Sequence, residues 1–275
     1  MKDQRTRAYA AGAKIARERH QREAPMDAEA LRRVTASDIV VVEGCYDHVQ
    51  AVLEALEMPH TRLADAQLDR VHLRPEQLLV INCPGNISPG AIVRVRDFVA
   101  AGGSLFTTDW ALRNVIEPAF ANTIAYNERR TADDVVRIEI ADADNPFLAG
   151  VIDPGEEPLW WLEGSSYPIR VLDTDRVKVL VRSSELESKY GEAPVAVHFT
   201  YGRGEVFHMI SHYYLQRTEL RTARHQQSAA SYAEAKGVDL VDVDTRGLAV
   251  GDVESAASSA RLLTNVIARK KRRDD

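Results

Sequence analysis

The sequence predicts an α/β fold in which a mainly parallel sheet carries an antiparallel extension and helical segments flank both ends. Continuous apolar runs at 39–42 and 78–81, and a third run at 104–108 that follows a glycine pair, are typical of strands that are covered on both faces. A helix between the second and third runs alternates with them, which predicts parallel strands joined by right-handed crossovers. Two later runs, 195–199 and 205–210, are joined by a Tyr-Gly-Arg-Gly turn that predicts an antiparallel pair.

The segments between these runs support the same order. Residues 46–57 place apolar side chains at helical spacing, and 60–63 is predicted to be a short strand. Ser88 is a helix N-cap residue and Pro89 suits the first helical position, so a helix begins there and ends at the glycine pair before the third run. The remaining predicted elements are strands at 135–140 and 177–181 and helices at 213–234 and 255–270.

A chain of 275 residues, 45% of them hydrophobic, is long enough to bury one full core. We therefore expect one α/β domain at 37–215, with an insert at about 117–175. A helical basic arm precedes this domain at 1–36, and a helical extension follows it at 216–275. The paired tryptophans of the insert, Trp160-Trp161, favour packing against the core over the wall of a pocket.

The arm at 1–36 carries nine Lys and Arg against five Asp and Glu, and its apolar positions are sparse. We therefore expect it to bury little surface within the domain. The chain ends in a second basic run at 269–273. Both basic segments predict contacts with a protein partner, made by the arm together with the C-terminal helices.

Bulk properties exclude several classes of protein. The net charge of −6 argues against a nucleic-acid partner, because phosphate neutralisation needs a concentrated basic face. Cys45 and Cys83 each follow an apolar run, which indicates reduced thiols and not a secreted disulfide scaffold. No apolar window approaches a membrane-spanning length, and the N-terminus has no apolar leader. We expect a cytoplasmic protein with no membrane contact and no cofactor.

Three segments follow one another in a recognisable order: FVAAGGSLF at 98–106, NPFLAGV at 145–151, and YGRGEVF at 201–207, which leads to Ser211-His212. Over about residues 38–215 the chain resembles the class I glutamine amidotransferase-like superfamily, and within it the trehalose-utilisation (ThuA-like) branch. The resemblance implies a flavodoxin-like three-layer sandwich.

The resemblance also implies where a glutaminase triad would lie. The cysteine nucleophile at the turn after a strand corresponds to Asp109, the histidine to His212, and the acid two residues later to Tyr214. An aspartate cannot form the thioester that glutamine hydrolysis requires, and a tyrosine cannot stabilise an imidazolium as a carboxylate does. The triad is degenerate, and we expect no glutaminase activity.

Parallel sheets bind ligands beyond the carboxyl ends of their strands, and polar residues follow several predicted strands here. The candidate catalytic residues are Asp109, His212 and Cys83. The candidate ligand-binding residues at the same rim are Gly44, Cys45, Tyr46, Asn86, Trp110 and Tyr214.

Each catalytic candidate also has a structural interpretation. Asp109 suits a helix N-cap, and His212 suits a buried, hydrogen-bonded histidine. Cys83 suits a packed thiol, which needs a basic neighbour such as His212 to become a nucleophile. A metal site requires Asp47 or His48 to converge with Asp109 and His212, and the lack of short ligand spacings leads us to expect none.

Two functions follow. The first is a binding or scaffold component of a cytoplasmic assembly, a pseudoenzyme with a ligand at the rim of its sheet. The alternative is a hydrolase or other small-molecule enzyme that uses the three catalytic candidates. A polar pocket with a contact between His212 and Asp109 favours the enzyme, whereas a rim filled by Trp110, Tyr213 and Tyr214 favours the binding role.

Overall fold

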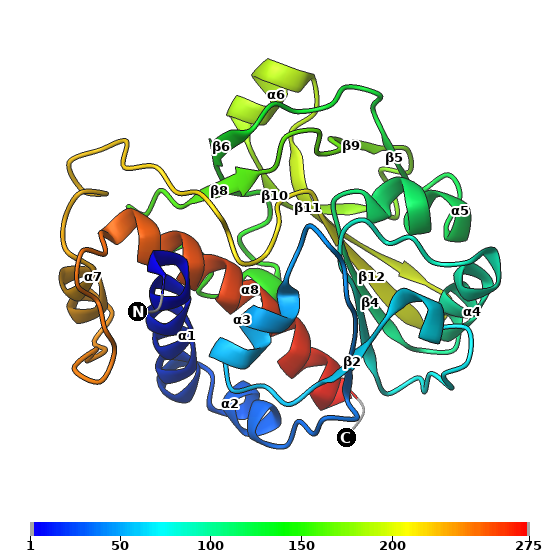
Figure 1. The fold of residues 1–275 in the computed structure, drawn as a ribbon, viewed down its shortest axis with the longest axis horizontal. Helices are drawn as coiled ribbons and strands as arrows, with labels where there is room; N and C mark the ends of the chain where they lie inside the picture. The colour runs from blue at the N-terminus through cyan, green and yellow to red at the C-terminus, as the bar shows by residue number, and fades with distance from the viewer. Residues whose placement is uncertain (1–2, 274–275) are drawn as a thin grey trace.

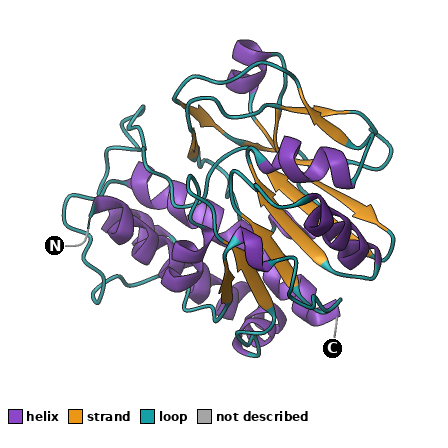
Figure 2. Cartoon of the chain, turned by 45° about the vertical axis from the view of Figure 1, so that its right-hand side comes forward, coloured by secondary structure: helices purple, strands orange, loops and turns teal. Residues whose placement is uncertain are grey.

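An eight-stranded mixed sheet forms the centre of the computed structural model, which describes residues 3–273 (Figures 1 and 2). The strand order is β2-β1-β3-β4-β12-β11-β10-β7. The first five strands are parallel, and each of the last three is antiparallel to its neighbour. The strands are β1 (Ile39–Val42), β2 (Thr61–Leu63), β3 (Leu78–Ile81), β4 (Ser104–Thr108), β7 (Glu139–Ile140), β10 (Lys178–Arg182), β11 (Pro194–Tyr201) and β12 (Gly204–Met209).

Two small antiparallel sheets lie beside the large one. They pair β5 (Ile124–Tyr126) with β9 (Ile169–Val171) and β6 (Asp134–Arg137) with β8 (Leu159–Leu162). The helices are α1 (Gln4–Glu23), α2 (Pro25–Arg32), α3 (Val49–Ala55), α4 (Pro89–Ala100), α5 (Glu117–Ala119), α6 (Ser184–Tyr190), α7 (Ala229–Ala235) and α8 (Val250–Arg273), with short helical turns at Asp65–Gln67, Leu112–Ile116 and Pro146–Leu148.

The predicted parallel core and its antiparallel extension are confirmed. Strands β1, β3 and β4 are buried at every position, as their continuous apolar runs predict. Ser88 caps α4 by accepting the backbone N–H of Ala91 at 3.0 Å. The hairpin places β11 beside β12, and β12 pairs in parallel with β4, so the extension joins the parallel sheet directly.

Two predicted elements are wrong in part. The run at 135–140 divides between β6 and β7, which belong to different sheets. Residues 213–234 are mostly irregular, and only Ala229–Ala235 forms a helix there. Trp160 and Trp161, by contrast, are buried in β8, in agreement with the predicted core packing.

The arm is helical as predicted, but the expectation that it buries little surface is wrong. Helices α1 and α8 lie side by side and form the most extensive helix pair of the described residues (Figure 1). The buried face of α1 consists largely of alanine together with Gly12, and a Cβ at Gly12 would lie 2.7 Å from the backbone nitrogen of Ala257. Small side chains let the helices approach closely, so a face of low hydrophobicity still packs tightly.

The basic end of α8 contacts the amino edge of the parallel sheet. Lys270 donates to the carbonyl oxygen of Gly102 at 3.1 Å, and Arg273 donates to the same oxygen at 3.0 Å. Lys271 pairs with Asp38, which immediately precedes β1. The terminal basic run is therefore largely used within the chain.

No helix among residues 3–273 is both long and apolar enough to cross a membrane.

Candidate functional site

Four residues lie just after the ends of four neighbouring strands, at the carboxyl edge of the sheet. Asp47 lies after β1, Cys83 after β3, Asp109 after β4 and His212 after β12. The parallel register of these strands brings their ends together. Each of the four residues is at most 1% exposed, so the cluster is internal.

Asp109 occupies a sharp turn at the end of β4, where its φ is +43°. A non-glycine residue in this region is unusual, and such strain is often found at functional sites. Its backbone N–H donates to the carbonyl of Met209 at 2.9 Å, which fixes the turn against β12. The helical turn that follows begins after Ala111, and Asp109 does not cap it. The N-cap interpretation is therefore wrong.

The carboxylate of Asp109 instead accepts hydrogen bonds from a distant loop. The backbone N–H of Tyr167 donates to Oδ1 at 2.8 Å, and the hydroxyl of Ser166 donates to Oδ2 at 3.0 Å. Burial raises the pKa of Asp109, although these bonds and His212 oppose the shift. Asp109 is thus an anchored acid within a dry environment.

His212 lies between two carboxyl groups. Its Nε2 is 2.9 Å from Oδ2 of Asp109, and its Nδ1 is 3.1 Å from Oε2 of Glu163. The second contact has the distance of an ion pair without the alignment of a hydrogen bond. Burial by itself lowers the pKa of His212, but Asp109, Cys83 and Glu163 outweigh it and raise that pKa well above its ordinary value. The imidazole is therefore predisposed to carry a proton.

Cys83 completes the cluster as a protonated thiol. Its Sγ lies 3.9 Å from Oδ2 of Asp109, and its backbone N–H donates to the hydroxyl of Thr108 at 3.0 Å. Burial raises the pKa of Cys83 to about 11, and the negative charge of Asp109 adds to this although His212 opposes it. A thiol with this pKa is a poor nucleophile at neutral pH.

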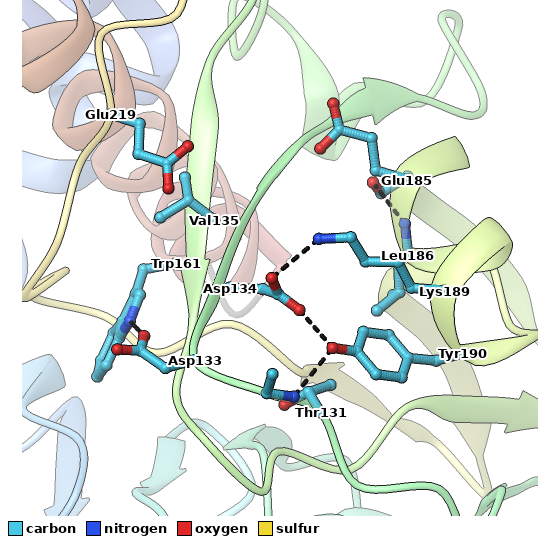
Figure 3. A network of polar contacts seen from close by, with 12 residues as sticks. Thr131, Asp133, Asp134, Val135, Trp161, Glu185, Leu186, Lys189, Tyr190 and Glu219 are labelled. Carbon is cyan, nitrogen blue, oxygen red and sulfur yellow. Dashed lines mark hydrogen bonds and ion pairs between the residues drawn. The ribbon is translucent and has the colours of Figure 1, made fainter.

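The insert supplies the cover of the site. Trp161 of β8 packs its ring edge against His212, with centroids 5.6 Å apart, and its carbonyl accepts the hydroxyl of Ser211 at 2.9 Å. Figure 3 shows how the insert is held: the indole of Trp161 donates to Asp133, while Asp134 accepts from Lys189 and Tyr190 of α6. These bonds fix the loop that carries Glu163 over the histidine.

Aromatic side chains cover the outside of the cluster. Trp110 stacks on Tyr167 with centroids 5.4 Å apart and contacts Tyr46 on its other side at 5.5 Å. Its indole N–H donates to the carbonyl of Ser165 at 2.8 Å. Tyr46 is 42% exposed, so this aromatic row begins at the surface and ends above the buried acids.

The other ligand-binding candidates are dispersed. Gly44 packs against the backbone of Cys83, where a Cβ would lie 2.0 Å from the carbonyl oxygen. Cys45 and Asn86 are exposed, and Asn86 bonds to Asn114. Tyr214 lies away from His212: it packs on Tyr9 of α1, and its hydroxyl bonds to Thr6.

Sequence reasoning missed three groups of the site. Ser166 and Tyr167 bind Asp109, and Glu163 takes the position beside the imidazole that the resemblance implies for Tyr214. These residues lie in an irregular loop more than fifty positions from Asp109. The only local signal was a turn-rich segment at 163–168, which does not identify its partner.

One group of the described residues has the composition of a metal site. Cys83, Asp109 and His212 place one ligand atom each within 4.8 Å of one another. Nothing in the sequence led us to expect a metal site, and this group differs from the one considered there: Cys83 takes the place of Asp47 or His48 beside Asp109 and His212.

No family model and no curated protein matches the chain. Similar solved structures include a glutamine amidotransferase from Thermotoga maritima, at 10% identity and a TM-score of 0.48, covering 85% of this chain and 97% of that one. They also include a ThuA-like protein from Bacteroides uniformis, at 12% identity and a TM-score of 0.45, covering 65% and 84%. A β-galactosidase from Rahnella sp. R3 matches at 13% identity and a TM-score of 0.48, covering 65% of this chain but only 29% of the enzyme.

Proposed function

We propose that this protein is a non-glutaminase, amidotransferase-like domain that acts as a binding or scaffold component of a cytoplasmic protein assembly. The observation that carries the proposal is the state of Asp109, which stands at the nucleophile's turn, is 1% exposed and is held by Tyr167, Ser166 and His212. Both cysteines are free, which agrees with a reducing compartment.

The chemistry of the cluster argues against glutamine hydrolysis. A carboxylate at position 109 offers no thiol, and the nearby Cys83 is held protonated by its burial. Both Asp109 and His212 lie beneath the insert and are only 1% exposed. A domain with this fold and no available nucleophile is suited to binding.

We infer that the partner surface lies in the C-terminal extension and not on the basic face of α1. On α1, Arg7 pairs with Asp244, Lys14 with Asp242 and Arg19 with Asp153, so these charges are used within the chain. A more open surface is the groove of about 660 Å³ between α7 and the following loop. Val241 lines that groove and is 88% exposed.

A capture experiment tests the binding role. The full chain is tagged, expressed in its native host and purified under mild crosslinking, together with Val241→Asp and the matched variant Leu172→Asp, whose side chain is 49% exposed elsewhere on the surface. We expect a stoichiometric partner that is retained by Leu172→Asp and lost with Val241→Asp. Equal recovery by all three proteins, or no partner at all, contradicts the proposal.

An activity assay tests the second part of the proposal, that the protein has no glutaminase activity. Purified protein should release no ammonia from glutamine, and Asp109→Cys reports whether a thiol at the turn restores turnover. Wild-type turnover that disappears in Cys83→Ala means that the nucleophile has moved to the neighbouring strand, and the non-glutaminase reading is then wrong.

The second candidate function is a hydrolase or other small-molecule enzyme. It is favoured by the position of His212 between Asp109 and Glu163, an arrangement that suits proton transfer. Incubation with a metabolite extract of the host, followed by mass spectrometry, distinguishes the two functions. Consumption of a metabolite by wild type but not by His212→Gln supports the enzyme and contradicts the scaffold.

A further inference from the structure

We propose that Cys83, Asp109 and His212 form a binding site for a zinc-like divalent transition-metal ion at the carboxyl edge of the sheet. The inference goes beyond the proposed function, because a metal held here is compatible with either binding or catalysis. It begins from the ligand atoms, which come from three neighbouring strand ends and lie within 4.8 Å of one another.

The donor set matches the chemistry of zinc. Thiolate sulfur, imidazole nitrogen and carboxylate oxygen are its ordinary ligands, and three protein ligands leave a fourth position for water or substrate. Two ligands of one tetrahedral ion lie roughly 3.3 to 3.8 Å apart, given the usual bond lengths. The distance from Oδ2 of Asp109 to Sγ of Cys83 is 3.9 Å, and that to Nε2 of His212 is 2.9 Å. Shifts of a few tenths of an ångström in the side chains accommodate the ion.

The surroundings of His212 have the form expected of a metal ligand. Its Nε2 faces Asp109, while its Nδ1 faces the carboxylate of Glu163 at 3.1 Å. A metal-bound histidine commonly directs its second nitrogen at a carboxylate, which sets the tautomer and orients the ring. Glu163 is therefore a positioning residue in this proposal.

Charge provides an independent argument. Asp47 is fully buried beside the cluster, and its Oδ2 has no hydrogen-bond partner among the described residues. The contacts of Asp109 are a thiol, a hydroxyl, a backbone N–H and one imidazole. Two buried acids therefore share a single ionisable base. A divalent ion at this edge would favour the ionised form of both carboxyl groups.

Binding is accompanied by proton release. The ion forms bonds to Sγ of Cys83, to a carboxylate oxygen of Asp109 and to Nε2 of His212. The thiol proton of Cys83 and any proton on Nε2 leave to solvent, because only the thiolate and the unprotonated nitrogen are ligands. No electron is transferred. Since all three ligands are buried, loading and removal of the ion are slow.

The test uses the full chain, stripped with a chelator and titrated with Co²⁺ until the spectrum is constant. We expect one Co²⁺ per chain, the intense visible bands of a tetrahedral site, and a sulfur-to-cobalt charge-transfer band. Zn²⁺ should displace the Co²⁺. Cys83→Ser should lose the charge-transfer band, whereas the matched variant Cys45→Ser, which alters the exposed cysteine, should keep it. Glu163→Gln should bind about 10- to 100-fold more weakly.

A second measurement covers the case in which Cys83→Ser does not fold. In the Cys45→Ser background, Cys83 is the one remaining thiol. Its alkylation by iodoacetamide in mild denaturant should slow at least tenfold when Zn²⁺ is present. No bound Co²⁺, binding without a thiolate band, a band that depends on Cys45, or alkylation that Zn²⁺ leaves unchanged each overturns the proposal. The capture experiment with Val241→Asp does not depend on any of these outcomes.

Discussion

The two edges of the parallel sheet both bury carboxyl groups, but they compensate the charge differently. At the amino edge, Glu205 contacts Arg273 at 3.1 Å, His198 at 3.3 Å and the hydroxyl of Ser104 at 2.9 Å. Burial raises the pKa of Glu205, yet His198 and Arg273 outweigh it, so the net shift is downward. At the carboxyl edge burial prevails, and the pKa of Asp109 is raised.

The difference lies in the groups that compensate the buried charge at each edge. At the amino edge, lysine and arginine from the basic end of α8 bind a backbone carbonyl and the carboxylate of Glu205. Their charges do not depend on a bound group. At the carboxyl edge, a single histidine, His212, contacts the buried acid Asp109 and compensates its charge. Groups with strongly shifted pKa values gather at functional sites, and this contrast therefore directs attention to the carboxyl edge.

The largest effect should follow from removing the single base of the carboxyl edge. His212→Ala leaves Asp109 buried with no cation, which we expect to lower the free energy of unfolding by about 3–5 kcal/mol. Urea denaturation of the metal-free protein measures it. The double variant Asp109→Asn/His212→Ala should regain part of the loss, because the charge is gone. A loss below about 1 kcal/mol for His212→Ala means that the edge is compensated in another way.

A smaller effect should come from the helix contact that supports the amino edge. Gly12→Ala places a Cβ 2.7 Å from the backbone of Ala257, so α1 and α8 must separate, which we expect to destabilise the protein by about 1–3 kcal/mol. The matched variant is Gly90→Ala in α4, where the nearest atom, Oδ1 of Asp69, would lie at 3.3 Å. Thermal unfolding should show Gly90→Ala near wild type. Equal melting temperatures for the two variants contradict the close approach of the helices.

The pH dependence of stability tests whether burial without a partner acid lowers the pKa of a histidine. Burial lowers the pKa of His208 on β12 to about 3, whereas the unfolded chain titrates near its ordinary value of 6.5. Neutral His208 therefore contributes fully to the free energy of unfolding above pH 6.5. This contribution is lost as the pH falls towards 3, at up to about 1.4 kcal/mol per pH unit. His208→Asn should flatten the slope of unfolding free energy against pH. An unchanged slope shows that His208 is protonated in the folded protein.

The smallest effect should follow at the amino edge. Arg273 is 40% exposed, and an ion pair of that exposure contributes at most about 1 kcal/mol. Arg273→Ala should therefore change the free energy of unfolding by less than about 1 kcal/mol, since His198 and Ser104 still bind Glu205. A loss as large as that of His212→Ala removes the distinction between the two edges.

The sequence predicted the sheet well because its signals are local. The runs that became β1, β3 and β4, the capped start of α4 and the hairpin between β11 and β12 all follow from short-range pattern and turn chemistry. The predicted convergence of Cys83, Asp109 and His212 is confirmed, since parallel strands place their ends at one edge. The failures lay where the pattern was weak: residues 213–234 favour helix by composition but have no apolar face to fix one.

The sequence by itself determined the parallel core with its antiparallel hairpin and the absence of a thiol at position 109. Only the tertiary structure decided that Asp109 binds the loop at 166–167, that Glu163 faces His212, and that the alanine-rich face of α1 packs on α8. The physical reason is distance along the chain. Contacts between residues fifty or more positions apart depend on how the layers pack, and neither spacing nor composition encodes which side chains then meet.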